Sequence, residues 1–490
     1  MTYSTNLGLR RPAGQTNLSN TEHHHAAAPR HSGVVFWPLV AIVSLAPLPF
    51  ASVTVYAWAP LASATAAILA LWSALLVFGV TRLSVSPTRF AIPGLLFAGA
   101  IIWICLQIAP FTPASWHHPV WPRAAEVLST KLPGSVTLDR FATASALARL
   151  LWYAAIFWLA LQLCRNADAA RRALGALALA AFLYAAYGLA IEFSGARMVL
   201  WMEKFAYLDS VTSTFINRNS YATYAGIGLI ALTAAIVRKL THQQGGGGPT
   251  GNRVSAGVVF LFEHAWHLLL AWAVVVTALF LTDSRAGVVS SLIGLIAFLL
   301  VLASSRTRAR RAFIWGLVPV LAVLVGFFAI SGDVVGKRLV RTLGATDLRF
   351  EIYDVTLNGI SKYPLLGTGY GTYRQAFELL RPEKFSHGGV ILRAHNTYLE
   401  NALELGIPAA ALLTLSVLLL AIICLRGVRR RRTDAFYPAL GVGVTILVGL
   451  HSLVDFSLQM PAVSVTYAFI MGIACAQSWS SRDGRTGVAV

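Results

Sequence analysis

Asn217, Arg218 and Asn219 place several hydrogen-bond donors together, directly before a long apolar stretch. A helix that starts here would direct its free N–H groups and an arginine toward an anion. The competing interpretation is a capped and solvated helix start, with Asn219 or Ser220 as the capping residue. The motif therefore predicts a helix N-terminus and leaves an anion site open.

Arg285 lies in a second motif, Asp283-Ser284-Arg285, between two long apolar stretches that leave almost no loop. We expect this turn to lie at a membrane surface, with Arg285 tucked between helices. Arg285 then either grips a phosphate in the plane of the lipid headgroups or pairs with Asp283 in a turn that only fixes the topology. The residue types favour neither role.

His395 belongs to a third motif, Arg393-Ala394-His395-Asn396, which precedes a short amphipathic segment. Thr397 and Glu400 have the spacing of a capping box, so His395 would stand just before a helix N-terminus. The helix dipole disfavours an imidazolium there, and a neutral imidazole can act as a general base. A histidine that only caps or packs is the alternative.

His451 and Asp455 form the fourth motif, at the end of another apolar stretch. Their i and i+4 spacing places both on one face of a helix. The pair suits either an aspartate that orients a histidine or a structural pair that faces the neighbouring helices. We favour the structural pair.

The composition identifies the elements that must position these residues. Hydrophobic residues make up 57% of the 490 residues and charged residues only 12%, whereas soluble proteins carry about 25% charged residues. This balance excludes a disordered chain, a coiled coil and an ordinary cytosolic enzyme. We predict an all-α polytopic membrane protein with about 12 transmembrane helices and a large, partly helical outer loop between spans 9 and 10.

Twelve apolar stretches approach the roughly 20 residues that a helix needs to cross a bilayer. They cover residues 34–51, 54–80, 90–109, 145–163, 173–192, 220–237, 259–282, 286–303, 312–331, 406–425, 437–454 and 459–477. All four polar motifs then lie at the same side of the membrane, each at the end of a span.

The net charge of +19 predicts the orientation of these spans. With the N-terminus in the cytoplasm, every short inner loop is basic; the loop after residue 425, for example, contains Arg426, Arg429, Arg430, Arg431 and Arg432. This is the positive-inside pattern, so the charge sets topology and indicates no nucleic acid. We expect a multi-pass membrane protein with both termini cytoplasmic.

The chain divides into regions by hydropathy and charge. We expect a disordered cytoplasmic tail over 1–33, N-terminal transmembrane helices over 34–199, a second transmembrane region over 200–477 that includes the outer loop 332–405, and a cytoplasmic tail over 478–490. The outer loop is the long connection in which we look for function.

Two elements are predicted inside the outer loop. Apolar residues near helical spacing over 347–360 predict a helix that lies on the membrane surface. The glycines of Gly367-Thr368-Gly369-Tyr370-Gly371 predict a tight turn, and no strand precedes them as a dinucleotide-binding fingerprint requires. The loop is therefore expected to be ordered.

The four polar motifs together suit a lipid-linked diphosphate donor and a hydroxyl acceptor. The outer side has no acidic cluster for a metal, and the four scattered cysteines suit neither a zinc site nor a disulfide framework. Arginine would then neutralise the diphosphate, as a cation that stays charged. The rival interpretation is a transporter or flippase, which would place charged or broken helices near the bilayer midplane, in paired halves that this sequence lacks.

The motifs occur in a definite order over about residues 200–460: Phe215-Ile216-Asn217-Arg218-Asn219, Asp283-Ser284-Arg285-Ala286-Gly287, Pro364-Leu365-Leu366-Gly367-Thr368-Gly369, Ala394-His395-Asn396-Thr397-Tyr398-Leu399-Glu400 with Gly406 after it, and His451-Ser452-Leu453-Val454-Asp455-Phe456. In these segments the chain resembles the O-antigen ligase and Wzy-type polysaccharide polymerase superfamily. The first 200 residues resemble it only in hydropathy.

The resemblance implies a metal-independent membrane glycosyltransferase without a cofactor. It would transfer or polymerise a glycan from a polyprenyl-diphosphate carrier to a glycan or lipid A core acceptor, at the outer face of the inner membrane. The implied roles are His395 and Arg285 in catalysis, and substrate binding by Arg218, Asn217, Asn219, Arg393 and Asn396, with His451 and Asp455 as secondary candidates. Ligases, polymerases and protein-glycosylating relatives share these motifs, so the acceptor stays open.

Overall fold

The structure of the chain is a computed structural model, which describes residues 32–243, 259, 262–305, 348–383, 385, 389–431 and 433–479. Within these ranges the chain is helical apart from turns, loops and one two-stranded hairpin, β1 (Met198–Val199) with β2 (Met202–Glu203). The predicted span 312–331, nearly all of the predicted tail 1–33 and residues 480–490 lie outside the described residues.

Eleven apolar helices coincide with predicted spans: α1 (Ser32–Leu45), α2 (Val55–Val77), α3 (Ala91–Ile108), α5 (Arg140–Leu163), α6 (Ala167–Ser194), α7 (Arg218–Gln243), α9 (Trp266–Phe280), α10 (Arg285–Ala303), α14 (Ile407–Arg430), α15 (Phe436–His451) and α16 (Pro461–Ala476). Seven of the helices in the described residues are long and apolar enough to cross a membrane, while α1, α9, α15 and α16 are shorter. The all-α polytopic class is confirmed.

Local sequence explains where several predicted spans begin. Helix α5 starts five residues earlier than predicted because the Asp139 carboxylate caps it, accepting a hydrogen bond from the Ala142 N–H. Asn166 caps α6 in the same way, which lengthens that helix at its start. Helix α9 is shorter than the predicted stretch 259–282, because Ala265 departs from helical geometry directly before Trp266.

Helices α7 and α10 run parallel and in contact, so their N-termini lie side by side. The added methyl group of an alanine at Gly287 would meet Ala222, and one at Gly226 would lie 2.0 Å from the Ser291 hydroxyl. Leu447 of α15 packs against the same glycine. Glycine, alanine and serine at these positions are small enough to let the two helices approach this closely. Helix α7 is the central helix of the described bundle, since 94% of its membrane-spanning apolar segment is buried.

Arginines predicted for the inner loops gather at the opposite end of the bundle from the α7 and α10 N-termini. The guanidinium of Arg89 lies 4.9 Å from the ring centre of Trp479, just after α16. Arg165 and Arg431 each donate a hydrogen bond of 2.8 Å to the carbonyl oxygen of Trp479. Loops far apart in sequence therefore meet at one basic end, as a shared side of the membrane requires.

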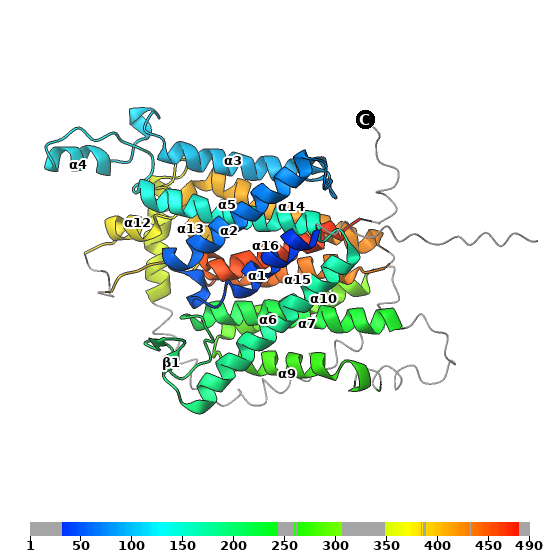
Figure 1. Cartoon of the computed structure of the whole chain (residues 1–490). Coiled ribbons are helices and arrows are strands. Elements are labelled where there is room, and N and C mark those ends of the chain that lie inside the picture. The colour runs from blue at the N-terminus through cyan, green and yellow to red at the C-terminus, as the bar shows by residue number, and fades with distance from the viewer. Residues whose placement is uncertain are drawn as a thin grey trace, which may run out of the picture.

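The predicted regions 34–199 and 200–477 share one hydrophobic core. Helix α5 packs along α16, where Ala160 sits against Gly472, and α3 packs along α14. Figure 1 shows these pairs stacked lengthwise, with α4 (Val120–Val127), α12 (Tyr373–Leu380) and the hairpin at the same end of the molecule. The N-terminal helices are thus a structural part of the bundle that carries the motifs.

The described part of the predicted outer loop forms a small helical unit with a core of its own. Residues 348–362 are helical, and α12 and α13 (Thr397–Leu405) pack against them. The predicted helix is therefore present over the described residues 348–360, and its expected position on the membrane surface stays a prediction. Ile352 and Val355 are buried in the core of this unit, because Phe377 and Leu403 cover them.

The predicted glycine turn is confirmed, and its contacts explain the glycines. Gly367, Gly369 and Gly371 all have positive φ, of 69°, 109° and 85°. A Cβ atom at Gly369 would lie 1.9 Å from the Thr137 hydroxyl, and its N–H donates to the Glu404 carbonyl at 2.9 Å. The turn thereby fastens the outer loop both to the start of α5 and to the end of α13.

Candidate active site

Three helix N-termini meet at one end of the bundle, which we call the His395 end and define by the first residues of α7, α10 and α13 together with residues 451–460. The Thr397 N–H donates to the Ser452 carbonyl at 2.9 Å, which places the start of α13 at the end of α15. The Thr223 hydroxyl of α7 lies 2.9 Å from Nδ1 of His451. The positive ends of three helix dipoles therefore face one region.

Asn217, rather than Asn219 or Ser220, caps α7. Its side-chain oxygen accepts hydrogen bonds from the N–H groups of Asn219 at 2.8 Å and Ser220 at 3.1 Å. The prediction placed the cap two or three residues too late, because all three residue types are good caps and the sequence does not fix the first helical turn. Arg218 is consequently the first residue of the helix.

Arg218 is half-buried and oriented by two contacts. One terminal nitrogen donates to the Ser210 hydroxyl at 3.3 Å, and the guanidinium lies 5.1 Å from the ring centre of Tyr207. Its Nε is buried without a hydrogen-bond partner in the described part of the chain. A fixed cation with a spare donor suits an anionic ligand.

Arg285 is the first residue of α10, and its side chain is exposed. The expectation that it would be tucked between helices is wrong, because the Ser284 hydroxyl caps the helix through the Gly287 N–H and turns Arg285 outward. Ser210 donates to the Asp283 carboxylate at 3.5 Å and accepts from Arg218. One serine thus joins the first two motifs.

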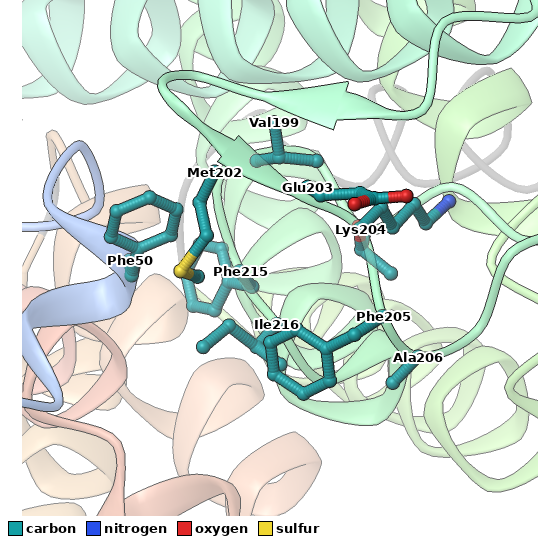
Figure 2. A pocket seen from close by; sticks show the side chains of 10 residues that line it. Phe50, Val199, Met202, Glu203, Lys204, Phe205, Ala206, Phe215 and Ile216 are labelled. Carbon is teal, nitrogen blue, oxygen red and sulfur yellow. The ribbon is translucent and has the colours of Figure 1, made fainter.

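Lys204 is a residue of this region that the sequence gave no reason to select. Its amine donates to the Ser210 carbonyl at 2.7 Å and lies 3.6 Å from the Glu192 carboxylate, with only 8% of the side chain exposed. It follows the hairpin directly, and Figure 2 shows its amine turned away from the apolar pocket formed there. Lys204 fixes the segment that carries Ser210.

A small apolar pocket of about 20 Å³ lies beside the segment just before Asn217, and the side chains that line it hold this segment in place. Phe50, Met202 and Phe215 face one another across it (Figure 2). Trp201 adds an edge-to-face contact with Phe50 at 5.1 Å. The hairpin therefore packs on the residues that lead into α7 and fixes the position of Arg218 at the start of that helix.

His395 faces Asp455 across the His395 end. Its Nδ1 lies 3.6 Å from the nearer Asp455 oxygen, and Phe456 packs against the ring with a centroid distance of 4.9 Å. Burial alone would raise the pKa of Asp455, but its contacts with His395 and His451 outweigh burial and lower that pKa below the usual range. The carboxylate is therefore ionised and stands beside an imidazole that is 30% exposed.

The side chains of His451 and Asp455 form no hydrogen bond or ion pair with each other, although the charge of His451 helps to lower the pKa of Asp455. His451 instead lies 2.9 Å from the Thr223 hydroxyl and 3.0 Å from the Ser457 hydroxyl through Nδ1. Helix α15 ends at His451, so the turn that follows directs the Asp455 carboxylate toward His395. The aspartate does orient a histidine, but the histidine belongs to another segment.

The predicted capping box of Thr397 and Glu400 is also wrong in detail. Asn396 caps α13, accepting from the N–H groups of Tyr398 at 3.0 Å and Leu399 at 3.1 Å. Glu400 is buried and reaches further back, accepting from Arg393 at 2.9 Å and from the N–H of Ala394. Arg393 is thus held in an ion pair within the loop.

The backbone of His395 is strained and is held by its surroundings. Its φ is 52°, which is uncommon for a residue other than glycine and costs of the order of 1 kcal/mol. The Tyr353 hydroxyl donates to its carbonyl at 3.0 Å, and the side-chain nitrogen of Asn396 donates to the Leu453 carbonyl. Residues on three segments therefore fix the position of one imidazole.

Arg349 and Tyr353 were not selected from the sequence, although they lie one helical turn apart beside the site. Burial raises the pKa of Tyr353, the positive charge of Arg349 opposes this, and the charge of Asp455 adds to it. These interactions place a further arginine next to the His395–Asp455 pair. Only the helical spacing of 349 and 353 could have suggested that they act together.

The structure brings all nine predicted site residues to the His395 end: Asn217, Arg218, Asn219, Arg285, Arg393, His395, Asn396, His451 and Asp455. Among the residues that the structure describes, no three His, Cys, Asp or Glu side chains form a group that could hold a metal ion. Two of the cysteines, Cys424 and Cys475, have sulfur atoms 3.6 Å apart, a proximity that their spacing did not indicate.

Comparison with known proteins agrees with the resemblance seen in the motifs. Residues 269–414 match the family model described as O-antigen ligase. The match includes the turn before α10, the glycine turn, the segment around His395 and the whole of α13. No curated protein matches the chain. Residues 269–414 therefore carry a domain similar to O-antigen ligases, which supports the resemblance to the O-antigen ligase and Wzy-type polysaccharide polymerase superfamily.

Proposed function

We propose that the chain is a metal-independent glycosyltransferase that transfers or polymerises a glycan from a polyprenyl-diphosphate carrier at the outer face of the bacterial inner membrane. The observation that carries the proposal is the meeting of three helix N-termini, two arginines and the His395–Asp455 pair at one end of the bundle. The match of residues 269–414 to the O-antigen ligase family supports a glycosyl-transferring enzyme.

Arg218 and Arg285 would bind the donor diphosphate. Each is the first residue of its helix, so the guanidinium and the positive end of the helix dipole act on the same anion. The parallel packing of α7 and α10 places these two helix starts side by side. Two arginines and two helix N-termini can neutralise a diphosphate and stabilise it as it leaves.

His395 would take the proton from the acceptor hydroxyl. Asp455 faces Nδ1, which favours the tautomer with the proton on Nδ1 and leaves Nε2 to accept. The acceptor oxygen then forms a bond to the anomeric carbon, the bond from that carbon to the diphosphate oxygen breaks, and the diphosphate leaves with the electron pair. Asp455 stabilises the imidazolium that results.

The basic end of the bundle supports the proposed topology. Arg89, Arg165 and Arg431 surround Trp479 at the end opposite His395. By the positive-inside pattern that end faces the cytoplasm, so the His395 end faces outward. Both termini are then cytoplasmic, and the donor must already have been carried to the outer leaflet.

The first experiment is the ladder of surface glycans of the host with this chain deleted, and then restored with the wild type or with His395→Ala. Long glycan left on its lipid carrier with bare lipid A core identifies a ligase. Carriers or surface lipids that hold one repeat identify a polymerase. Repeat units trapped at the cytoplasmic face identify a flippase and contradict the proposal, as does a full ladder with His395→Ala.

A further inference from the structure

A second site lies beside the His395 end, in a cavity of about 590 Å³ between α3, α5, α14, α15 and α16. Most of its wall is apolar, with Phe97, Phe157, Leu413 and Met471 among the lining residues. On α5 the lining extends from Ala146 to Trp158, a rise of about 18 Å. The cavity is therefore long enough for a lipid chain that lies along the helices.

The cavity reaches the lipid-facing surface of the bundle. Gly94 of α3 and Leu418 of α14 both line it and are both exposed. A Cβ atom added at Gly94 would meet no other heavy atom within 4 Å. A lipid can therefore enter sideways between these helices without leaving the membrane.

The other end of the cavity is polar and carries Arg149, Arg393, Glu400 and Glu404. Arg393 is neutralised by Glu400, at 2.9 Å. Burial and the charge of Glu400 raise the pKa of Glu404 to about 8, so this carboxyl is protonated at neutral pH. The four groups together then leave one positive charge.

Arg149 is the cation without a carboxylate. Its guanidinium lies 5.6 Å from the ring centre of Trp58, and it has no ion pair or hydrogen bond to any of the residues that the structure describes. An unpaired arginine within a membrane helix is costly and is therefore a candidate for a functional site. The charge of this end therefore complements an anionic headgroup.

Thr397 connects the cavity to Asp455, the residue that faces the proposed general base His395. Thr397 and Gln459 line it, and the Thr397 hydroxyl donates to the Gln459 side chain at 3.1 Å and to the Asp455 carbonyl at 3.3 Å. Neither Arg218 nor Arg285 lines it. An amphiphile held here is next to His395 and away from the arginines proposed for the donor.

We propose that this cavity binds the acceptor, as a lipid whose apolar chain fills the groove along α5 and whose phosphorylated headgroup is held by Arg149. The proposal rests on the proposed glycosyl transfer and narrows its acceptor to the lipid-anchored class. A protein acceptor would not need a groove of this length inside the membrane.

The test uses the full chain in phosphatidylcholine nanodiscs with phosphatidic acid that carries a photoreactive acyl chain. We expect labelling of peptides from α3, α5 and α14, and at least fivefold less labelling with a phosphatidylcholine of the same chains. Arg149→Gln should lower the phosphatidic acid labelling at least fivefold, and Arg149→Lys should retain most of it. Gly94→Leu should lower it by obstruction.

Gly175→Leu is the matched control, because a Cβ atom at this exposed glycine of α6 also meets nothing within 4 Å and Gly175 lies outside the cavity. Unlabelled lipid A should compete with the probe, and polyprenyl diphosphate should not. Competition by polyprenyl diphosphate would make the cavity a donor site and overturn the proposal. So would wild-type labelling of both Arg149→Gln and Gly94→Leu.

The labelling experiment and the deletion experiment test different proposals, so each can fail without the other. If the deletion strain showed a flippase or a normal ladder, the proposed transfer would be wrong even with labelling intact. If transfer were confirmed while no phosphorylated lipid labelled the cavity, the proposed glycosyltransferase activity would be supported and the proposed acceptor site would be wrong.

Discussion

At the scale of single residues, the arginines are the sharpest test of diphosphate binding. We expect Arg285→Lys to lose at least a hundredfold in glycan transfer, nearly as much as Arg285→Ala, because lysine cannot make a bidentate contact. The measurement is transfer from a purified lipid-linked donor. Arg171→Lys, in an exposed pair with Asp168 on α6, is the matched control. Full activity of the Arg285→Lys enzyme would rule out the bidentate role.

Asp455→Asn tests the histidine partner. The variant keeps the shape of the side chain but loses the charge that faces His395. We expect kcat to fall by about 10²–10⁴, with the KM for the donor within about twofold of wild type, because Asp455 acts through His395. Asp168→Asn, an exposed aspartate on α6, is the control. A rise in donor KM at constant kcat would instead place Asp455 in donor binding.

The sequence identified the right residues at this scale but assigned several contacts wrongly. His451 and Asp455 were paired because helical periodicity only relates positions within one element. The observed partner, His395, comes from a segment more than fifty residues away, and only the folded chain brings it close. Lys204 and Arg349 were missed for a similar reason, since Glu192, which faces Lys204, and His451, on which the charge of Arg349 acts, lie in other elements.

At the scale of elements, the caps set where the functional arginines stand. Asn217→Ala removes the cap of α7 and should lower the free energy of unfolding by about 1 kcal/mol, while shifting Arg218 and reducing transfer. Asn219→Ala should cost much less, because its side chain accepts no capping bond. Thermal unfolding in detergent, with transfer measured alongside, compares the two variants. Equal losses would contradict the assignment of the cap.

Element positions were predictable wherever hydropathy alone decides them. Hydrophobic runs gave the apolar helices, but caps moved their ends, as Asp139 did for α5 and Ala265 for α9. The outer-loop helix shows the limit. Its apolar spacing was real, yet a spacing does not distinguish a lipid surface from Phe377 as the group that covers it.

At the scale of the whole molecule, stability should depend on pH through Glu404. Its pKa of about 8 in the folded chain exceeds its usual value, so the folded state holds a proton that the unfolded state releases. The contribution of Glu404 to stability is therefore most favourable at low pH and falls as pH rises from about 4 toward 8. Glu404→Gln should flatten the thermal unfolding profile between pH 5 and 8, by about 1.4 kcal/mol for each pKa unit removed.

An unchanged slope with Glu404→Gln would contradict the protonated state of this carboxyl. Asp455 has the opposite sign, because its lowered pKa contributes stability above its unfolded value and loses it only in acid. The two groups therefore act in different pH windows. The fold class could be predicted without these interactions, since the composition alone indicated a helical membrane protein. The composition could not predict which helices pack against each other.

The parallel contact of α7 and α10 has a consequence for how the chain can vary. Two helices that run the same way must be separated by a return crossing, and α9 supplies it, with its C-terminal Leu281 accepting a hydrogen bond from Val211 near the start of α7. Gaining or losing a single crossing between Arg218 and Arg285 would put the two arginines on opposite faces of the membrane. The site is thus subject to a parity rule: insertions between these arginines are tolerated in pairs of crossings or not at all.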